Sequence, residues 1–537
     1  MGTMTGSVLI VDALSAGSGK RTASRDSIGC GPRAIAGVFE KHEITCSIRR
    51  IEAVLDGRGK ARHADHLAVS AMSMDVASVT QLLALWRRRH SSGRVLLGGP
   101  IASDAGSVLE QLRPDVILIG EGEATLEELI TSGYLDEPVD ISQIAGLGYL
   151  SSTKAVLTPP RHHLPAERLW KEYPPSISRI LDYPTYQASK VYVETIRGCS
   201  NYRRTSLRLP DGRECSDCGN CDSDSPEARM DCPEGIQPGC GFCSVPAVWG
   251  PPRSRNAASI VQEIDALLDL GVHRVVLEAP DFLDYMRGDY PMTSPCDPPP
   301  NLDAISSLLN QITELPQISS GDVHLAIENM KACLFTEEVA VVLKKVLKTI
   351  SPNIGLETGS ESHSHQIGKC GTPDDVVRAV TLAKQYGMTP FVYFIYGLPG
   401  ETEETVEQSI ESMRNVADAG AERIILYGFR PLPASAFSDF DAPKPADPLS
   451  RRLRVEARRI NRKRKDNYLS KVIRGIAAEP SWDRHGYTMV YPLGEGPLMT
   501  VEGGFSPGSV LDIKITVVHS PGLLGGVVVK NSQSTVP

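Results

Sequence analysis

The stretch that begins Arg197-Gly198-Cys199 and ends Cys240-Gly241-Phe242-Cys243 holds seven of the twelve cysteines in the chain. Between its two ends lie Cys215-x-x-Cys218-x-x-Cys221 and Cys232. Thiolates packed this densely in one segment of a large chain usually hold metal, so the stretch predicts a metal-binding site. A structural zinc site without a catalytic role is the simplest alternative. The other five cysteines are scattered along the sequence: Cys30, Cys46, Cys296, Cys333 and Cys370.

The composition is that of a large globular protein. The chain has 537 residues, 41% of them hydrophobic and 23% charged, which is enough for about two to four domains with cores of their own. The net charge of -9 argues against a protein that coats nucleic acid. Residues 1–12 lack the pattern of a signal peptide, and no apolar stretch approaches the ~20 residues that cross a bilayer. We therefore expect a cytoplasmic protein that does not bind membranes, in which clustered cysteines hold metal rather than form disulfides.

Residues 1–150 alternate short apolar strands with amphipathic helices. This order predicts an α/β domain built as a doubly wound parallel sheet with helices on both faces. The four expected strands cover residues 7–12, 66–70, 94–99 and 116–120. Glycines end two of these strands, as Gly98-Gly99 and Gly120-Glu121-Gly122. Because ligands bind beyond the carboxyl ends of the strands in such sheets, these glycines predict a ligand-binding edge, with tight turns as the simpler interpretation.

A proline-rich connector is expected at residues 151–190, and a second α/β series follows at residues 191–437. Its six expected strands cover residues 191–196, 274–278, 324–327, 354–357, 391–396 and 423–426. Six β/α units predict a full or partial barrel, whose chemistry lies at the C-terminal ends of the strands. The cysteine-rich stretch directly follows the first of these strands, so we expect it at that end of the barrel.

Two further segments complete the chain. Residues 438–480 are strongly basic with interspersed apolar residues, which favours a surface helix with one buried stripe over a nucleic-acid contact. Residues 481–537 change to β alternation with glycine turns and predict a small antiparallel β-barrel.

Three motifs at expected strand ends resemble those of the radical S-adenosylmethionine (SAM) enzymes. They are the pair Cys240-Gly-Phe-Cys243, the strand end Gly355-Leu-Glu357-Thr-Gly359-Ser360, and the turn Gly397-Leu-Pro-Gly400-Glu401-Thr. The resemblance implies that Cys199, Cys240 and Cys243 hold a [4Fe–4S] cluster whose fourth iron binds SAM. Residues 200–239 are inserted into the usual compact cysteine loop, so the first ligand is either Cys199 or a cysteine of the insertion. We favour Cys199 because it follows the strand directly.

The same resemblance implies roles for residues around the cluster. Phe242 stands where such loops place an aromatic ring against adenine. Tyr396 is a candidate catalytic residue that positions substrate or closes the site, although a barrel tyrosine serves equally well in packing. Further contacts to the cofactor are implied for Glu278, Glu357, Gly359, Ser360 and Arg430.

The N-terminal domain resembles the cobalamin-binding module of the cobalamin-dependent radical SAM subfamily. The Asp-x-His-x-x-Gly signature of a cobalt-ligating histidine is absent. The resemblance therefore implies cobalamin with no histidine of this domain on its lower face, and the alternative is a nucleotide-binding domain. The implied cobalamin contacts are Ser70, Met72, Gly98, Gly99, Gly120, Glu121 and Gly122.

The inserted segment carries four cysteines, and four thiolates close a zinc site or hold a second cluster. The spacing favours structural zinc, without separating the two alternatives. The four candidate ligands are Cys215, Cys218, Cys221 and Cys232.

Together these features resemble the family of methanogen enzymes that C-methylate a glutamine of methyl-coenzyme M reductase, and the terminal barrel resembles a TRAM domain. This resemblance implies transfer of a methyl group from SAM, by way of methylcobalamin, to an unactivated sp3 carbon in a post-translational modification. It implies a protein substrate, namely the reductase alpha subunit or a peptide from it, and an electron donor such as ferredoxin or flavodoxin. It does not imply a nucleic-acid partner.

Two other functions remain open from the sequence. The TRAM-like tail and the basic segment favour a tRNA methylthiotransferase, but the N-terminal domain has only Cys30 and Cys46 where those enzymes carry three cysteines for another cluster. The third possibility is a zinc-bearing scaffold without catalysis.

Overall fold

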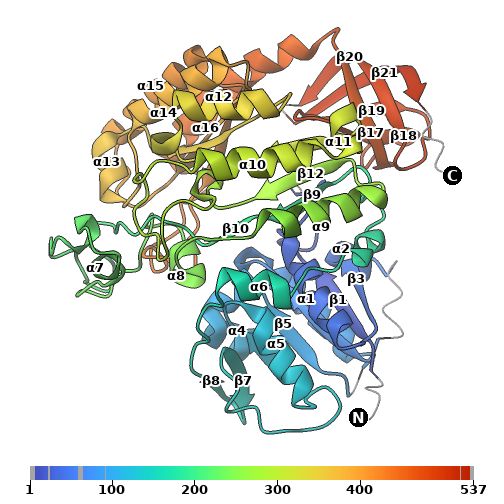
Figure 1. Ribbon diagram of the computed structural model, residues 1–537, viewed down its shortest axis with the longest axis vertical. Helices are drawn as coiled ribbons and strands as arrows, with labels where there is room; N and C mark the ends of the chain where they lie inside the picture. Colours follow the sequence, from blue (N-terminus) through green and yellow to red (C-terminus); the bar gives the residue numbers. More distant parts are fainter. Residues whose placement is uncertain (1–5, 22–23, 58–63, 91, 521, 533–537) are drawn as a thin grey trace. The chain divides into compact units, whose positions relative to one another are not determined.

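The computed structural model describes residues 6–21, 24–57, 64–90, 92–520 and 522–532. The chain forms two compact units, residues 1–186 and 187–537 (Figure 1). Among the helices of the described residues, none combines the length and the apolar character that crossing a membrane requires.

The first unit is a doubly wound α/β domain. Its seven-stranded sheet has the order β3-β1-β4-β5-β6-β7-β8. The parallel strands are β1 (Val8–Asp12), β3 (Cys46–Arg50), β4 (His66–Ser70), β5 (Val95–Gly98) and β6 (Val116–Leu118). The antiparallel hairpin of β7 (Leu147–Ser151) and β8 (Lys154–Leu157) extends the sheet past residue 150. The two-residue strand β2 (Ser27–Ile28) lies outside this sheet.

Helices cover both faces of this sheet because its strands are apolar on both sides. On one face α1 contacts α5, and on the other face α3 contacts both α2 and α4 (Figure 1). Every residue of β1 is buried, and its Leu9 and Val11 belong to the core beneath α3 and α4. The helices are α1 (Cys30–Lys41), α2 (Ile51–Leu55), α3 (Val76–Arg87), α4 (Ala105–Leu112), α5 (Gly122–Thr131) and α6 (Ala166–Glu172).

The second unit is built on six parallel strands in sequential order. Strands β9, β12 and β13 pair in one sheet and β14, β15 and β16 in another, and a parallel bridge between Asn329 and Asn353 joins the two. This arrangement is the partial β/α barrel that the sequence predicts. The strands are β9 (Lys190–Glu194), β12 (Arg274–Glu278), β13 (His324–Ile327), β14 (Asn353–Glu357), β15 (Phe391–Tyr396) and β16 (Arg423–Gly428).

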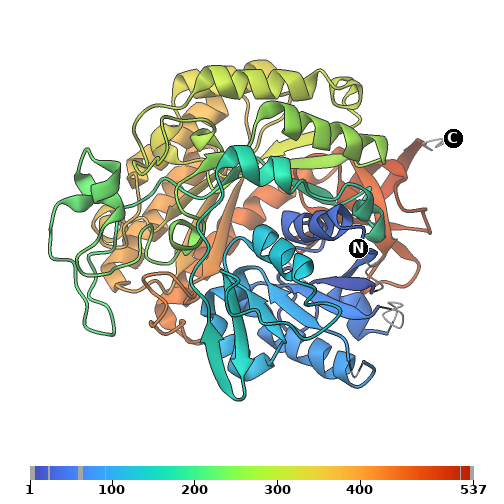
Figure 2. The ribbon, with the colours of Figure 1, turned by 60° about the horizontal axis from the view of Figure 1, so that its bottom comes forward.

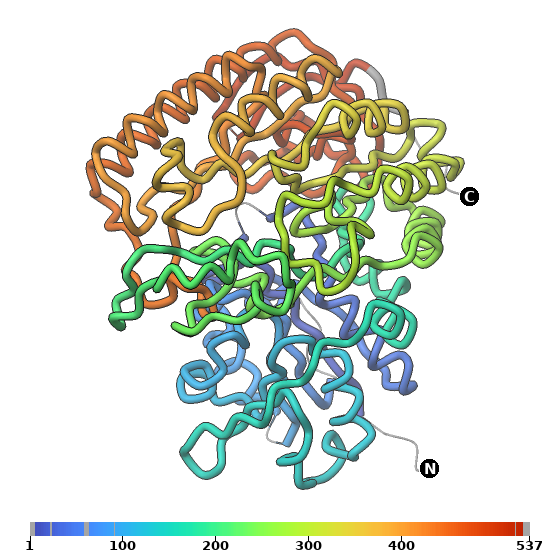
Figure 3. The backbone as a smooth tube through the Cα atoms, turned by 60° about the vertical axis from the view of Figure 1, so that its left-hand side comes forward, coloured from blue at the N-terminus to red at the C-terminus, as the bar shows by residue number. Residues whose placement is uncertain are grey.

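Helices form the outer layer of this barrel, visible in yellow and orange in Figure 2. They are α9 (Ala257–Asp269), α10 (Leu302–Thr313), α11 (Pro316–Ser320), α12 (Glu337–Val346), α13 (Glu361–Gln366), α14 (Pro373–Gln385) and α15 (Glu403–Ala419). The cysteine-rich insertion contains α7 (Pro226–Met230) and is mostly irregular; it appears in green in Figure 3. It returns to the barrel through α8 (Val245–Trp249) and a short antiparallel pair of β10 (Ile196–Arg197) and β11 (Arg253–Ser254).

The basic segment is helical over only part of its expected length. Helix α16 (Pro448–Lys465) buries Leu453, Ala457 and Ile460 on one face, as its helical spacing predicts. The expectation of helix up to residue 480 was wrong, because Val472–Pro480 form strand β17. The alternation of side chains in this strand fits the sheet of the terminal barrel better than it fits a helix.

Five strands form a closed barrel of order β17-β18-β19-β21-β20, as the sequence predicts. The prediction that the barrel is antiparallel was wrong for one pair, because β19 and β21 run parallel. Its core includes Ala477, Val490, Val501 and Leu511. The loop between β18 and β19 carries Glu495, whose carboxylate lies 3.0 Å from Lys190 Nζ at the start of β9 and 3.7 Å from His324 Nε2 at the start of β13. The remaining strands are β18 (Tyr487–Pro492), β19 (Leu498–Glu502), β20 (Val510–Ser520) and β21 (Leu523–Ser532).

Candidate active site

Cys199 and Cys240 lie on either side of Asn201 at the C-terminal end of the barrel, and Cys243 follows on the loop of Cys240. Asn201 donates its backbone N–H to Cys199 Sγ (3.5 Å) and its side-chain amide to Cys240 Sγ (3.3 Å). The Cys243 amide donates to the Cys240 carbonyl (2.8 Å), while the three sulfurs do not all lie within 4.8 Å of one another. Burial raises the pKa of Cys199 to about 12, and it raises the pKa of Cys240 as well. The structure therefore places the three predicted cysteines in one region of the barrel end, with their sulfurs spaced more widely than the ligands of a single metal ion.

Glycines let the backbone close tightly around these thiols. A Cβ atom at Gly241 would lie 2.4 Å from Cζ of Phe437, and one at Gly198 would lie 2.4 Å from the carbonyl oxygen of Pro251. The Gly241 amide donates to the Ile367 carbonyl (2.7 Å), and the Phe437 amide donates to the Gly241 carbonyl (2.8 Å). Three cysteine sulfurs, held by this closely packed backbone, are a donor set that binds a [4Fe–4S] cluster and leaves one iron free. The residues present therefore fit the cluster.

A buried charge network supports the backbone beside Cys199. Lys331 Nζ lies 2.9 Å from Asp281 and 2.8 Å from Asp284, and it donates to the hydroxyl of Ser200 (2.7 Å). Arg287 lies 2.7 Å from Asp284 on the other side. None of the charged side chains in this network is more than 10% exposed. Ser200, the residue after Cys199, is thus held by a network of four paired charged side chains.

The motif around Glu357 is held in an unusual backbone conformation. Glu357 has a φ of 68°, and its carboxylate lies 3.3 Å from Lys369 Nζ. A Cβ at Gly355 would lie 2.3 Å from Glu357 Oε1 and 3.0 Å from Lys369 Nζ, so a side chain there would displace this ion pair. Gly359 packs against α15, where a Cβ would lie 2.5 Å from Ser412 Oγ, and the buried Ser360 caps α13 by accepting from the His363 amide.

His363 connects this motif to the turn after β15. The two nitrogens of the buried ring lie 3.1 Å from Thr358 Oγ1 and 2.8 Å from the Pro399 carbonyl oxygen. Because a carbonyl only accepts, Nε2 carries the proton and Nδ1 accepts from the Thr358 hydroxyl. Burial lowers the pKa of His363, in keeping with this neutral form. The two loops therefore form one hydrogen-bonded layer at the rim of the barrel.

Glu401 makes the stability of this layer depend on pH. Its carboxylate accepts from the Gly397 amide (3.0 Å), and burial is the largest cause that raises its pKa to about 7, from an ordinary 4.5. The folded protein therefore binds this proton more tightly than the unfolded chain, and stability falls as pH rises from about 4.5 to about 7.

We expect Glu401→Gln to remove this pH dependence, because the amide oxygen still accepts from Gly397 and carries no charge. Above pH 7 the variant should be more stable than the parent by about 1–2 kcal/mol, a value discounted for partial exposure, with no gain at pH 4.5. Urea unfolding at several pH values measures this difference. The exposed Glu411→Gln on α15 is the control, and an equal effect from both variants would contradict the argument.

Polar side chains line the inner face of the barrel, and the sequence analysis missed most of them. The Tyr192 hydroxyl on β9 donates to Glu328 beyond β13 (2.7 Å), and Tyr393 on β15 stacks on Tyr427 of β16. The Glu328 carboxylate contributes to the raised pKa of Tyr393, so these groups face one another across the barrel. The alternation of Lys190, Tyr192 and Glu194 with valines was the signal that could have found them, because alternate residues of a strand share a face.

Two predicted site residues do not face this interior. Tyr396 stands on the opposite face of β15 from Tyr393, and the Arg454 guanidinium of α16 lies over its ring at 5.4 Å from the centroid. Its surroundings are therefore those of a packing residue on the helix side, the alternative that the sequence left open. Arg430, two residues past β16, is exposed. Glu278 ends β12 beside Glu194 of β9, and Phe242 packs against the apolar cluster that contains Phe437.

The four cysteines of the insertion do not converge on one point. Among the described residues, their sulfurs form no group of three or more that all lie within 4.8 Å of one another. Cys215 and Cys232 pack against an apolar cluster, while the Arg204 guanidinium lies 3.6 Å from Cys221 Sγ. A zinc site in the insertion has no support from this arrangement.

In the first unit, the loops predicted to bind a ligand follow neighbouring strands. Ser70 and Gly98 end β4 and β5, and Met72 follows β4 closely. Gly99 has a φ of 90°, and a Cβ there would lie 2.8 Å from the Ala71 carbonyl oxygen, so the two loops approach backbone to backbone. Gly120 (φ 72°) has open space where its Cβ would stand, and Gly122 begins α5. Glu121 instead is buried and accepts from the Leu164 amide (3.1 Å).

Comparison with known proteins defines the class. Residues 232–413 match the family described as the radical SAM superfamily, a range that leaves Cys199 outside the match. A solved structure of the radical SAM methyltransferase TsrM from Kitasatospora setae, with cobalamin and a [4Fe–4S] cluster bound, is similar with a TM-score of 0.57. The two are 18% identical over 81% of this chain and 77% of that one. Residues 232–413 are thus a radical SAM domain, a type of domain that uses a [4Fe–4S] cluster and SAM.

Two relatives match over almost their whole lengths. They are the uncharacterised proteins MK0932 of Methanopyrus kandleri, 38% identical over 98% of this chain and 97% of the relative, and MJ1620 of Methanocaldococcus jannaschii, 38% identical over 97% and 98%. This chain belongs to the same family as these two proteins.

Proposed function

We propose that this protein is a cobalamin-dependent radical SAM methyltransferase that transfers a methyl group to an unactivated carbon of a protein. One observation carries the proposal. A trio of thiols at the C-terminal end of a six-stranded parallel barrel occurs in one chain with a doubly wound α/β unit, and TsrM shares this fold. When bound, the cluster would supply the electron that cleaves SAM, and the cobalamin would carry the methyl group.

The first unit has loops that suit a flat macrocycle. The segments after β4, β5 and β6 lie at one edge because these strands are neighbours in the sheet. They expose small residues, and Gly120 leaves open space at its Cβ position. Ser70, Met72, Gly98, Gly99, Gly120 and Gly122 would contact the cobalamin, whereas the hydrogen bond from Leu164 assigns Glu121 to loop structure.

The barrel residues would hold SAM and keep water from the reacting atoms. Glu357, fixed by Lys369, and Glu278 present carboxylates at the strand ends near the thiol trio, where they can accept from the ribose or the amino group of SAM. At the opposite end of the barrel, Glu495 forms an ion pair with Lys190 at the start of β9. Orientation and exclusion of water are the contributions that radical chemistry requires of the protein.

We propose further that the methyl acceptor is a glutamine of methyl-coenzyme M reductase and that ferredoxin or flavodoxin donates the electron. The resemblance of the sequence motifs to the glutamine C-methyltransferase family is what supports this substrate. Neither the charge of -9 nor the paired basic side chains of α16, such as Arg459 with Glu456, favours a nucleic-acid substrate.

The test is an anaerobic reaction with cobalamin, a reductant and SAM that carries a deuterated methyl group. We expect mass spectrometry to find the labelled methyl on the glutamine of a peptide from the reductase alpha subunit, and no label without cobalamin. A peptide with alanine at the glutamine position is the matched control. Deoxyadenosine formation without peptide labelling would reject the substrate, and a thiomethylated tRNA product would favour the methylthiotransferase instead.

A further inference from the structure

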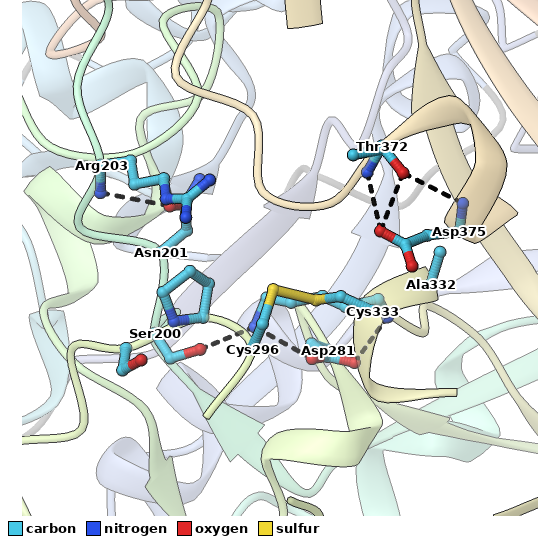
Figure 4. Close-up of a disulfide and its surroundings, with 12 residues drawn as sticks. Ser200, Asn201, Arg203, Asp281, Cys296, Ala332, Cys333, Thr372 and Asp375 are labelled. Atoms are coloured by element: carbon cyan, nitrogen blue, oxygen red, sulfur yellow. Dashed lines mark hydrogen bonds and ion pairs between the residues drawn. A yellow bond between two sulfur atoms is a disulfide. The ribbon is translucent and has the colours of Figure 1, made fainter. Parts of the chain in front are cut away.

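Three cysteines that are scattered in the sequence meet in the second unit. The sulfurs of Cys296, Cys333 and Cys370 all lie within 4.8 Å of one another. Cys296 and Cys333 form a disulfide in this structure, shown in Figure 4. Within the residues that the structure describes, this is the one group of three or more candidate metal ligands with such close donor atoms. Neither the cysteine trio of the candidate cluster site nor the insertion uses these three side chains.

The barrel topology explains this convergence. Cys296 follows β12, Cys333 follows β13 and Cys370 follows β14, and these three strands are consecutive in the barrel. Since the carboxyl ends of parallel strands lie at one end of a barrel, loops more than thirty residues apart in the chain meet there. The group therefore stands at the end of the barrel where chemistry takes place.

Hydrogen bonds hold two of the three segments in place. The buried Arg287 donates to the carbonyls of Ser294 (2.8 Å) and Pro298 (2.8 Å), on either side of Cys296. Arg378 donates to the carbonyls of Ala332 (3.0 Å) and Phe335 (2.8 Å), on either side of Cys333. These two guanidinium groups fix the loops without any contribution from the sulfur atoms.

The third segment packs directly on the second. A Cβ atom at Gly371 would lie 3.6 Å from Cβ of Cys333, so the backbone next to Cys370 touches Cys333. Thr372, which follows, starts α14 with a reciprocal capping box to Asp375 (Figure 4). The buried Cys370 is thus presented to the other two sulfurs by a rigid turn.

Two lysines stand next to the sulfur group. Lys331 precedes Cys333 by two residues, and Lys369 adjoins Cys370. Their ammonium groups pair with Asp281, Asp284 and Glu357 at 2.8–3.3 Å, so the charged side chains beside the sulfurs neutralise one another. Three thiolates around a divalent ion carry one net negative charge, which these paired groups neither cancel nor increase.

We propose that Cys296, Cys333 and Cys370 bind one soft divalent metal ion, of which Zn²⁺ is the best example, and that the disulfide is the oxidised, metal-free form of this site. An all-sulfur donor set selects soft metals. Tetrahedral Zn²⁺ with Zn–S bonds of about 2.3 Å places its sulfurs about 3.8 Å apart, which fits a group within 4.8 Å. Three protein ligands leave a fourth position for a small ligand, as in catalytic zinc sites.

Reduction followed by metal binding converts the disulfide form into the metal-bound form. A trialkylphosphine reduces the disulfide to two thiols, water supplying the two protons and the oxygen that the phosphine takes up. Binding of the divalent ion to three thiols then releases three protons, one from each sulfur.

The first experiment uses the unmodified full-length protein, reduced with a trialkylphosphine under anaerobic conditions. Samples with and without Zn²⁺ are alkylated, and peptide mass spectrometry measures the modification of each cysteine. We expect Zn²⁺ to protect Cys296, Cys333 and Cys370 together, and a chelator to remove this protection. Equal alkylation of the three with and without Zn²⁺, or a disulfide that persists after phosphine treatment, would overturn the proposal.

The second experiment counts metal in variants. Cys333→Ser should lower bound zinc by about one ion per chain relative to the parent, while iron and sulfide stay unchanged. The buried Cys46→Ser in the first unit is the matched control and should lose none. A loss of about four irons and four sulfides in Cys333→Ser would show an iron–sulfur cluster instead, and equal zinc in all three proteins would show no site at all.

Discussion

Replacement of Cys240 by alanine is expected to abolish formation of 5′-deoxyadenosine from SAM. Cys240 is linked through Asn201 to Cys199 in the cradle closed by Gly241, so its loss leaves two thiols for the cluster. Bound iron and sulfide should fall by about four each per chain, and the product should drop below detection in an anaerobic assay by liquid chromatography. Cys46→Ala, which removes a buried thiol of the first unit, should keep both.

The same assay decides the identity of the first ligand. Cys199→Ala should match Cys240→Ala, because the structure places Cys199 beside Asn201 and Cys240. Cys232→Ala should retain deoxyadenosine formation, because Cys232 packs in the apolar cluster around Phe437. If Cys232→Ala were inactive and Cys199→Ala active, the ligand would lie in the insertion. Activity in Cys240→Ala would remove the whole assignment.

The second large effect is expected for Lys331→Met. Lys331 is the charge shared by Asp281 and Asp284, and both carboxylates are 1% exposed. Removing it leaves Asp281 without its cation and Asp284 with Arg287 alone. Breaking a buried ion pair by deleting one partner destabilises a protein by about 3–5 kcal/mol, and we expect a loss in this range in urea unfolding.

Two companion variants make this result specific. The exposed Lys345→Met on α12 should change stability by less than about 0.5 kcal/mol. Adding Asp281→Asn to Lys331→Met should recover part of the loss, because the uncompensated charge is then gone. A loss below about 1 kcal/mol for Lys331→Met, or no recovery in the double variant, would contradict the role given to the network.

The strands and their order could be predicted from the sequence because the signal is local. Residues 8–11 are all apolar, and β1 is buried along them for that reason. The trio Cys199, Cys240 and Cys243 was also accessible, since two of its members are neighbours in a motif and the third directly follows a strand.

Features that depend on contacts with distant parts of the chain could not be predicted from the sequence in this way. Tyr396 was a candidate because it ends a strand, but the face it occupies depends on where α16 packs. The end of α16 was missed because Val472 finds its partners in β20, about forty residues further along the chain. Cys296, Cys333 and Cys370 looked isolated because only the order of the barrel strands brings their loops together.

Through the contact of Glu495 with Lys190, the terminal β-barrel supports the larger barrel, although the two residues lie far apart in the sequence. This β-barrel supplies the carboxylate that pairs with Lys190 at the start of β9 and lies 3.7 Å from His324 at the start of β13. A shortened chain ending near residue 480 would therefore lose more than an accessory module. Two strands of the α/β barrel would lose the anion that they share, and the stability of that barrel itself should fall.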